Sequence, residues 1–157
     1  MTSVSFVCWG NICRSPMAEQ VAREWAARQG IDVRFSSAGV SSEESGNPID
    51  ARAAAVLREA GYPVTPHRAH RIDADEIRRT DLVIGMERLH LDRMRRLVPE
   101  ADHLALLTDF DPDAAPGTPV DDPWYGPSSG FRQTLISIEA AMPGLMERLR
   151  QLAGEPV

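Results

Sequence analysis

The stretch from Val7 to Pro16 reads Val-Cys-Trp-Gly-Asn-Ile-Cys-Arg-Ser-Pro. The short apolar segment 3–8 ends at Cys8 and predicts a β-strand. Ser15-Pro16 is typical of a helix start, with Ser15 as the N-cap residue and Pro16 at the first helical position. The stretch therefore predicts a strand that passes through a tight loop directly into a helix.

The rest of the chain continues this alternation of strands and helices. We expect helices at 15–30, 50–60, 73–79 and 89–98, further strands at 33–37, 82–86 and 104–107, and loops at 41–48 and 108–130. A last helix carries apolar residues at helical spacing from Leu135 to Leu152, and Pro143 can kink it. Such alternation predicts an α/β fold with a parallel sheet covered by helices on both faces. Residues 1–157 are expected to form a single domain.

The composition of the chain indicates which kinds of partner and which cellular location to expect. The formal net charge of −6 argues against nucleic acid as the main partner. No apolar run approaches the roughly 18 residues that a membrane span requires, so we expect no membrane association. The N-terminal residues lack the pattern of a secretory signal, so we expect a cytoplasmic protein, with signal-independent export left open. A monomer is the default expectation.

The loop after the first strand has the properties of an oxyanion site. Backbone N–H groups at a helix N-terminus point at one spot, and the helix dipole adds positive potential there. Gly10 lets the backbone approach a ligand closely, and Asn11 tolerates a left-handed conformation. A thiol in such a field ionises readily, so we expect Cys8 to be a nucleophilic thiolate. The planar fork of Arg14 suits two phosphate oxygens, and Ser15 can donate a hydrogen bond to the sulfur.

Cys8 and Cys13 are the only cysteines of the chain. They are five residues apart in one loop, and this spacing matches neither a disulfide framework nor a CxxC metal motif. No second Cys/His cluster could complete a metal site. Cys13 leaves two interpretations open. It either packs and shapes the loop, or it forms a protective disulfide with Cys8 under oxidation.

These residues resemble the low-molecular-weight protein-tyrosine phosphatases, in particular the bacterial members. The resemblance is complete over Val7–Pro16 and extends over nearly the whole chain. It includes Met17-Ala18-Glu19, Ser37-Ala38-Gly39, Asp50-x-Arg52-Ala53, His67-Arg68-Ala69, Asp121-Asp122-Pro123-Trp124-Tyr125-Gly126 and Ile138-Glu139-x-Ala141-x-Pro143-Gly144-Leu145. The resemblance implies a four-stranded parallel sheet, a phosphate loop after its first strand, no metal or cofactor, and a phosphotyrosine protein or peptide as substrate.

The resemblance also assigns roles to single residues. It implies that Cys8 is the nucleophile, that Arg14 binds the phosphoryl group and that Asp122 is the general acid and base. Asp121 competes with Asp122, but the following Pro123 favours Asp122. The resemblance implies that a hydrogen-bonded network of Asn11, Ser15, Ser37 and His67 supports the loop. Substrate-binding residues are expected to be Trp9, Gly10, Asn11, Ile12, Cys13, Ser15, Trp124 and Tyr125.

One departure from the family pattern affects substrate preference. Family members usually carry an aromatic residue soon after Ser-Ala-Gly, whereas this chain reads Ser41-Ser-Glu-Glu-Ser45. We therefore expect one wall of the cleft to be polar and acidic.

Three other functions compete with phosphotyrosine hydrolysis. A thioredoxin-coupled arsenate reductase needs further cysteines that this chain lacks. A protein-arginine phosphatase carries Thr in place of Ile12, and an apolar side chain there suits a phenyl ring better than a guanidinium. A non-catalytic phosphate-binding module is expected to have lost Cys8 or Asp122, and both are present.

Overall fold

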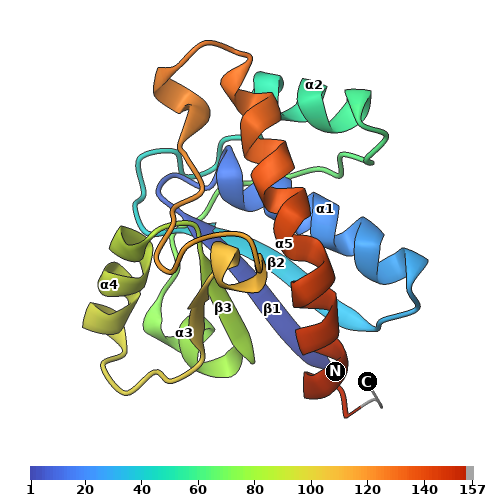
Figure 1. Ribbon diagram of the computed structural model, residues 1–157. Helices are drawn as coiled ribbons and strands as arrows, with labels where there is room; N and C mark the ends of the chain where they lie inside the picture. The colour runs from blue at the N-terminus through green and yellow to red at the C-terminus, as the bar shows by residue number, and fades with distance from the viewer. Residues whose placement is uncertain (155–157) are drawn as a thin grey trace.

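Four parallel strands form the central sheet of the computed structural model, which describes residues 1–154. The strands are β1 (Thr2–Cys8), β2 (Val33–Gly39), β3 (Leu82–Gly85) and β4 (Leu104–Leu106), and they lie in the order β2-β1-β3-β4 (Figure 1). The register pairs Cys8 with Gly39 and Val7 with Gly85. The carboxyl ends of the three longest strands therefore meet at one edge of the sheet, where ligands of parallel sheets bind.

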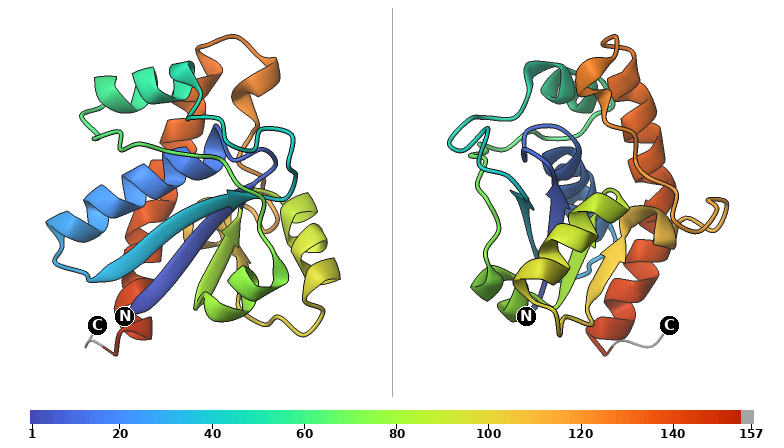
Figure 2. Two further views of the ribbon diagram at one scale, coloured as in Figure 1. Left: turned by 180° about the vertical axis from the view of Figure 1, so that it is seen from behind. Right: turned by 90° about the vertical axis from the view of Figure 1, so that its left-hand side faces the viewer.

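Helices cover both faces of this sheet (Figures 1 and 2). One hydrophobic cluster joins Phe6 of β1 to Met17 of α1 (Arg14–Arg28) and Ile138 of α5 (Gly130–Leu152), with α2 (Ala51–Glu59) packed beside them. A second cluster joins Val7 of β1 to residues of α3 (Ala74–Arg79) and α4 (Arg88–Leu97). Since successive strand residues point to opposite faces, Phe6 and Val7 mark the two layers. The predicted α/β fold is confirmed.

The predicted elements are present, with small shifts at their ends. The strand at 104–107 ends at Leu106, and the expected loop 108–130 contains part of the 3₁₀ helix η1 (Leu107–Phe110) and all of η2 (Pro123–Tyr125). Helix α1 ends at Arg28, and Gly30 follows with a φ of 68°, as expected for a glycine beyond a helix C-terminus. The helix α5 continues through Pro143.

The predicted N-cap role of Ser15 is wrong. Helix α1 begins at Arg14, so that Ser15 lies inside its first turn, and Cys13 occupies the N-cap position without a side-chain cap bond. The Ser15 hydroxyl bonds instead to the groups beneath the loop, which are the Cys8 sulfur, the Asn11 amide and the Ala38 carbonyl. The structure thus uses the residue to support the loop rather than to cap the helix.

Candidate active site

The loop between β1 and α1 forms the floor of a pocket. It folds tightly because Asn11 adopts a φ of 62°, the only positive φ of a non-glycine residue within residues 1–154. Gly39 gives the loop room on its far side, since a Cβ there would lie 2.7 Å from the carbonyl oxygen of Trp9. The close approach of loop and strand therefore requires glycine at position 39.

A buried polar network holds Asn11 in this conformation. Its side-chain amide donates to Ser15 Oγ at 2.9 Å and to Ser37 Oγ at 3.0 Å, and its side-chain oxygen accepts from the His70 N–H at 3.1 Å. His67 Nε2 donates to the Asn11 carbonyl at 2.6 Å. Buried polar groups that are fully bonded make a loop rigid, so the floor is fixed before any ligand arrives.

Cys8 lies at the centre of this floor. The residue is only 3% exposed, and Ser15 Oγ lies 2.9 Å from its sulfur. The backbone N–H of Asn11 donates to the same sulfur at 3.3 Å. The sulfur therefore accepts from one backbone N–H and lies beside a hydroxyl that can either donate to it or accept from it.

Cys13 differs from Cys8 in its surroundings. Both cysteines are free and buried, but burial, together with the nearby charge of Asp50, raises the pKa of the Cys13 thiol far above its usual range. Cys13 therefore stays protonated near neutral pH. The packing role of Cys13 and its protective disulfide with Cys8 both stay predictions.

Arg14 is anchored from several sides although it lines the pocket. Its guanidinium donates to Glu87 Oε2 at 2.7 Å and to the Val120 carbonyl at 2.8 Å, and Nη2 lies 3.6 Å from Asp122 Oδ2. The side chain is 3% exposed. A guanidinium held this firmly at the pocket floor is a preorganised partner for an oxyanion.

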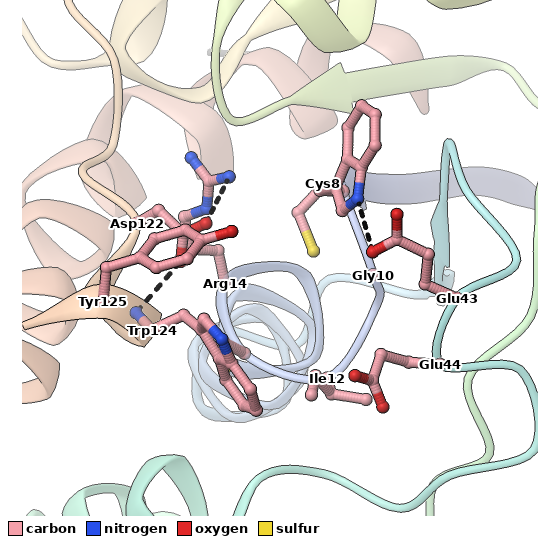
Figure 3. Close-up of a pocket in the computed structure, with 11 residues that line it drawn as sticks. Cys8, Gly10, Ile12, Arg14, Glu43, Glu44, Asp122, Trp124 and Tyr125 are labelled. Atoms are coloured by element: carbon pink, nitrogen blue, oxygen red, sulfur yellow. Dashed lines mark hydrogen bonds and ion pairs between the residues drawn. The ribbon is translucent and has the colours of Figure 1, made fainter.

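Two walls rise from the floor (Figure 3). One consists of Asp122, Trp124 and Tyr125, where Asp122 Oδ1 accepts from the Trp124 N–H at 3.1 Å. Trp124 is 42% and Tyr125 88% exposed, so that aromatic surface is available at the mouth. The opposite wall carries the two carboxylates Glu43 and Glu44, in agreement with the acidic segment seen in the sequence.

The structure brings most of the predicted site residues together in this pocket. Its lining contains Cys8, Trp9, Gly10, Ile12, Cys13, Arg14, Asp122, Trp124 and Tyr125. Asn11, Ser15, Ser37 and His67 lie beneath or beside the loop and bond to one another or to its backbone. Asn11 and Ser15 were predicted to bind substrate, and their side chains face the network rather than the pocket lining.

The sequence and the fold were compared with those of known proteins. The sequence model for the low molecular weight phosphotyrosine protein phosphatases matches residues 3–153. The chain belongs to this family. The low molecular weight protein-tyrosine phosphatase A of Mycobacterium tuberculosis is 41% identical over 145 residues, which is 90% of this chain and 88% of that protein. The predicted family is therefore confirmed.

Solved structures of other phosphatases share the fold. A protein tyrosine phosphatase from Entamoeba histolytica aligns with a TM-score of 0.91 at 26% identity over 98% of this chain and 99% of that one. The arginine phosphatase YwlE of Bacillus subtilis aligns with a TM-score of 0.84 at 26% identity over 96% and 97% of the two chains. The predicted four-stranded parallel sheet with flanking helices is thus confirmed.

Within residues 1–154 no helix is both long and apolar enough to cross a membrane. The same residues contain no group of three or more His, Cys, Asp or Glu side chains placed to hold a metal ion.

Two residues that contact Arg14 of this phosphatase are not among the residues predicted from the sequence. Glu87 pairs with Arg14, and His90, fully buried, places Nε2 3.5 Å from Arg14 Nη2. His90 Nδ1 accepts from the backbone N–H groups of Met86 and Glu87, both at 3.2 Å, so the proton of the neutral ring is assigned to Nε2. Burial, aided by the charge of Arg14, lowers the pKa of His90 to about 3. Both residues follow β3, at the carboxyl edge of the parallel sheet where ligands bind, and this position is the one sequence signal that could have indicated a role in the site.

Proposed function

We propose that this protein hydrolyses phosphotyrosine in proteins and peptides, and small aryl phosphates, through a cysteinyl-phosphate intermediate. The observation that carries this proposal is the convergence of Cys8, Arg14 and Asp122 on one pocket. The Cys8 sulfur lies on the floor between the Asn11 N–H and the Ser15 hydroxyl, and Asp122 Oδ2 lies 3.6 Å from the Arg14 guanidinium. A nucleophile, an oxyanion partner and a proton donor are thus in reach of one phosphoryl group.

In the first step the Cys8 thiolate attacks phosphorus. The S–P bond forms while the bond from phosphorus to the tyrosine oxygen breaks, and Asp122 gives its proton to that oxygen. Arg14 and the backbone N–H groups of the loop bind the phosphoryl oxygens during transfer. The Trp124 N–H bond to Asp122 Oδ1 directs the carboxyl group toward the pocket.

In the second step water hydrolyses the cysteinyl-phosphate. Asp122, now a carboxylate, takes a proton from the attacking water, the P–O bond to water forms and the S–P bond breaks. The Ser15 hydroxyl, 2.9 Å from the sulfur, donates to the departing thiolate. Inorganic phosphate leaves, and Cys8 and Asp122 return to their initial states.

The pocket fits a phenyl ring on two sides. Ile12 on the floor and Trp124 on the wall provide apolar surface, against which a tyrosine ring can pack. The structural likeness to an arginine phosphatase makes phosphoarginine the second candidate substrate. Ile12 favours the phenyl ring, because its apolar side chain offers no partner to a guanidinium.

We propose further that the chain acts as one domain and as a monomer on phosphoprotein substrates. No step above requires a second copy, a nucleic acid or a membrane surface. The expected cytoplasmic location stays a prediction.

The test compares a phosphotyrosine peptide with a phosphoarginine peptide of the same sequence, using reduced wild type and Cys8→Ser. We expect turnover of the phosphotyrosine peptide that is lost in Cys8→Ser. Selective turnover of the phosphoarginine peptide would show that the argument from Ile12 is wrong. Binding of both peptides without turnover by the reduced wild type would favour a phosphate-binding module.

A further inference from the structure

The wall that carries Glu43 and Glu44 gives the pocket a charged side. The two residues belong to the segment that follows β2, and their carboxylates stand across the pocket from Trp124 and Tyr125 (Figure 3). Glu43 is exposed and Glu44 is half-buried. A peptide whose phosphorylated side chain enters the pocket can place a neighbouring residue over this rim.

Neutral donors hold both carboxylates in place. Glu43 Oε2 accepts from the indole N–H of Trp9 at 3.1 Å, and Glu44 accepts from the side-chain amide of Asn47 at 2.6 Å. The Glu44 side chain also rests on Gly10, where a Cβ would lie 3.2 Å from its Cγ. These contacts orient the two charges without neutralising them.

No cation in the described part of the chain pairs with either carboxylate. Among residues 1–154, neither Glu43 nor Glu44 lies within 4.0 Å of a basic nitrogen in an ion pair. Arg93 stacks on the Trp9 ring at 4.6 Å and Arg52 pairs with Asp50 at 3.0 Å, and neither forms an ion pair with Glu43 or Glu44. The rim formed by Glu43 and Glu44 is therefore acidic, and it lies beside the loop that is proposed to bind the phosphoryl dianion.

This charge arrangement has a consequence for the substrate. Two fixed carboxylates repel the phosphate group and any acidic residue beside it, unless the substrate brings a positive charge of its own. The long side chains of Lys and Arg extend far enough from a neighbouring backbone position to place a cation on this rim.

We propose that Glu43 and Glu44 form a subsite that selects phosphotyrosine peptides with Lys or Arg next to the phosphotyrosine. This inference rests on the proposed phosphotyrosine phosphatase activity. Exposed ion pairs contribute modestly, so we expect kcat/KM for a basic-flanked peptide to exceed that for an alanine-flanked peptide by about three- to twentyfold. An acidic-flanked peptide has the lowest value of the three.

The test measures kcat/KM for three peptides that differ only in the two residues flanking the phosphotyrosine, which are both Arg, both Ala or both Glu. Phenyl phosphate, which has no flanking residues, is assayed beside them. Wild type is compared with Glu43→Gln/Glu44→Gln, in which the amide oxygens can still accept from Trp9 and Asn47. The readout is the ratio of the basic-flanked to the alanine-flanked value.

A matched control removes two acids far from the pocket. Asp102 precedes β4 at the opposite edge of the sheet, and Glu147 lies in the last third of α5. Both are exposed. Asp102→Asn/Glu147→Gln changes the net charge as much as the test variant does, and we expect it to keep the wild-type ratio.

The expected result is a ratio of about three to twenty in wild type and in the control that falls below about two in Glu43→Gln/Glu44→Gln. The ratio in wild type is also expected to shrink as the ionic strength rises from about 0.1 M to about 1 M. Equal values for the three peptides, or the same ratio in the test variant, would overturn the subsite while phenyl phosphate is still hydrolysed. Failure to hydrolyse phenyl phosphate would instead overturn the proposed function.

Discussion

Replacing Glu87 by Gln tests the idea that this residue balances the charge of Arg14. The guanidinium is 3% exposed and lies 2.7 Å from Glu87 Oε2, whose side chain is 31% exposed. Breaking a fully buried ion pair costs about 3–5 kcal/mol. Part of this cost is avoided here, since Glu87 is partly solvated, the Gln oxygen can still accept, and Arg14 keeps the Val120 carbonyl. We expect a loss of about 1–2 kcal/mol in the free energy of unfolding.

The assay is urea unfolding with and without inorganic phosphate. Phosphate bound to the loop neutralises the same guanidinium, so we expect the difference between Glu87→Gln and wild type to shrink when phosphate is present. Glu100→Gln is the matched control, because it removes the partner of Arg78 in a solvent-exposed pair, and we expect no measurable change there. A Glu87→Gln loss of the same size with and without phosphate would refute the charge-balance argument.

Three further predictions concern the acid, the loop and pH. Asp122→Asn is expected to slow the hydrolysis of phenyl phosphate by about 10²–10⁴-fold and to slow the hydrolysis of phosphate esters of strongly acidic phenols far less. Equal losses of rate for the two kinds of ester in steady-state assays would show that Asp122 is not the general acid. Gly39→Ala forces a Cβ to 2.7 Å from the Trp9 carbonyl, so we expect a loss of about 1–3 kcal/mol in unfolding experiments, and an unchanged midpoint would contradict this steric argument. Burial and, second, the charge of Arg14 lower the pKa of His90 from 6.5 in the unfolded chain to about 3 in the folded protein, so the stability contributed by the neutral ring is complete above pH 6.5 and is lost as the pH falls toward 3. We therefore expect the free energy of unfolding to depend less on pH in His90→Asn than in wild type, and parallel curves for the two proteins would show that His90 does not titrate this way.

Much of the floor of the pocket could be predicted from local sequence. The contiguous stretch Val7–Pro16 contains the strand end, the glycine, the Asn with its positive φ and the helix start, and each has a local physical signal. Ser15 shows the limit of such signals. Its position favours an N-cap, but the buried polar groups around Cys8 offered the hydroxyl better partners.

The walls and the supports of Arg14 depend on contacts between distant parts of the chain. Glu87 is 73 residues from Arg14 and His90 is 76 residues away, and nothing local distinguishes them from ordinary residues at the start of a helix. The role of Asp122 came from resemblance alone, because an Asp-Pro pair in a long loop is otherwise just a turn signal. The acidic wall is visible in the sequence as Glu43-Glu44. That no cation among residues 1–154 pairs with these carboxylates is a property of the fold.

The cysteinyl-phosphate is the central claim and can be observed directly. Acid-quenched enzyme taken during turnover of phenyl phosphate would be digested and analysed by mass spectrometry for a phosphoryl group on each cysteine-containing peptide. We expect one phosphoryl group on Cys8, and none on Cys13 or in the Cys8→Ser variant. Turnover without a phosphoryl group on Cys8, or with the group on Cys13, would contradict the mechanism.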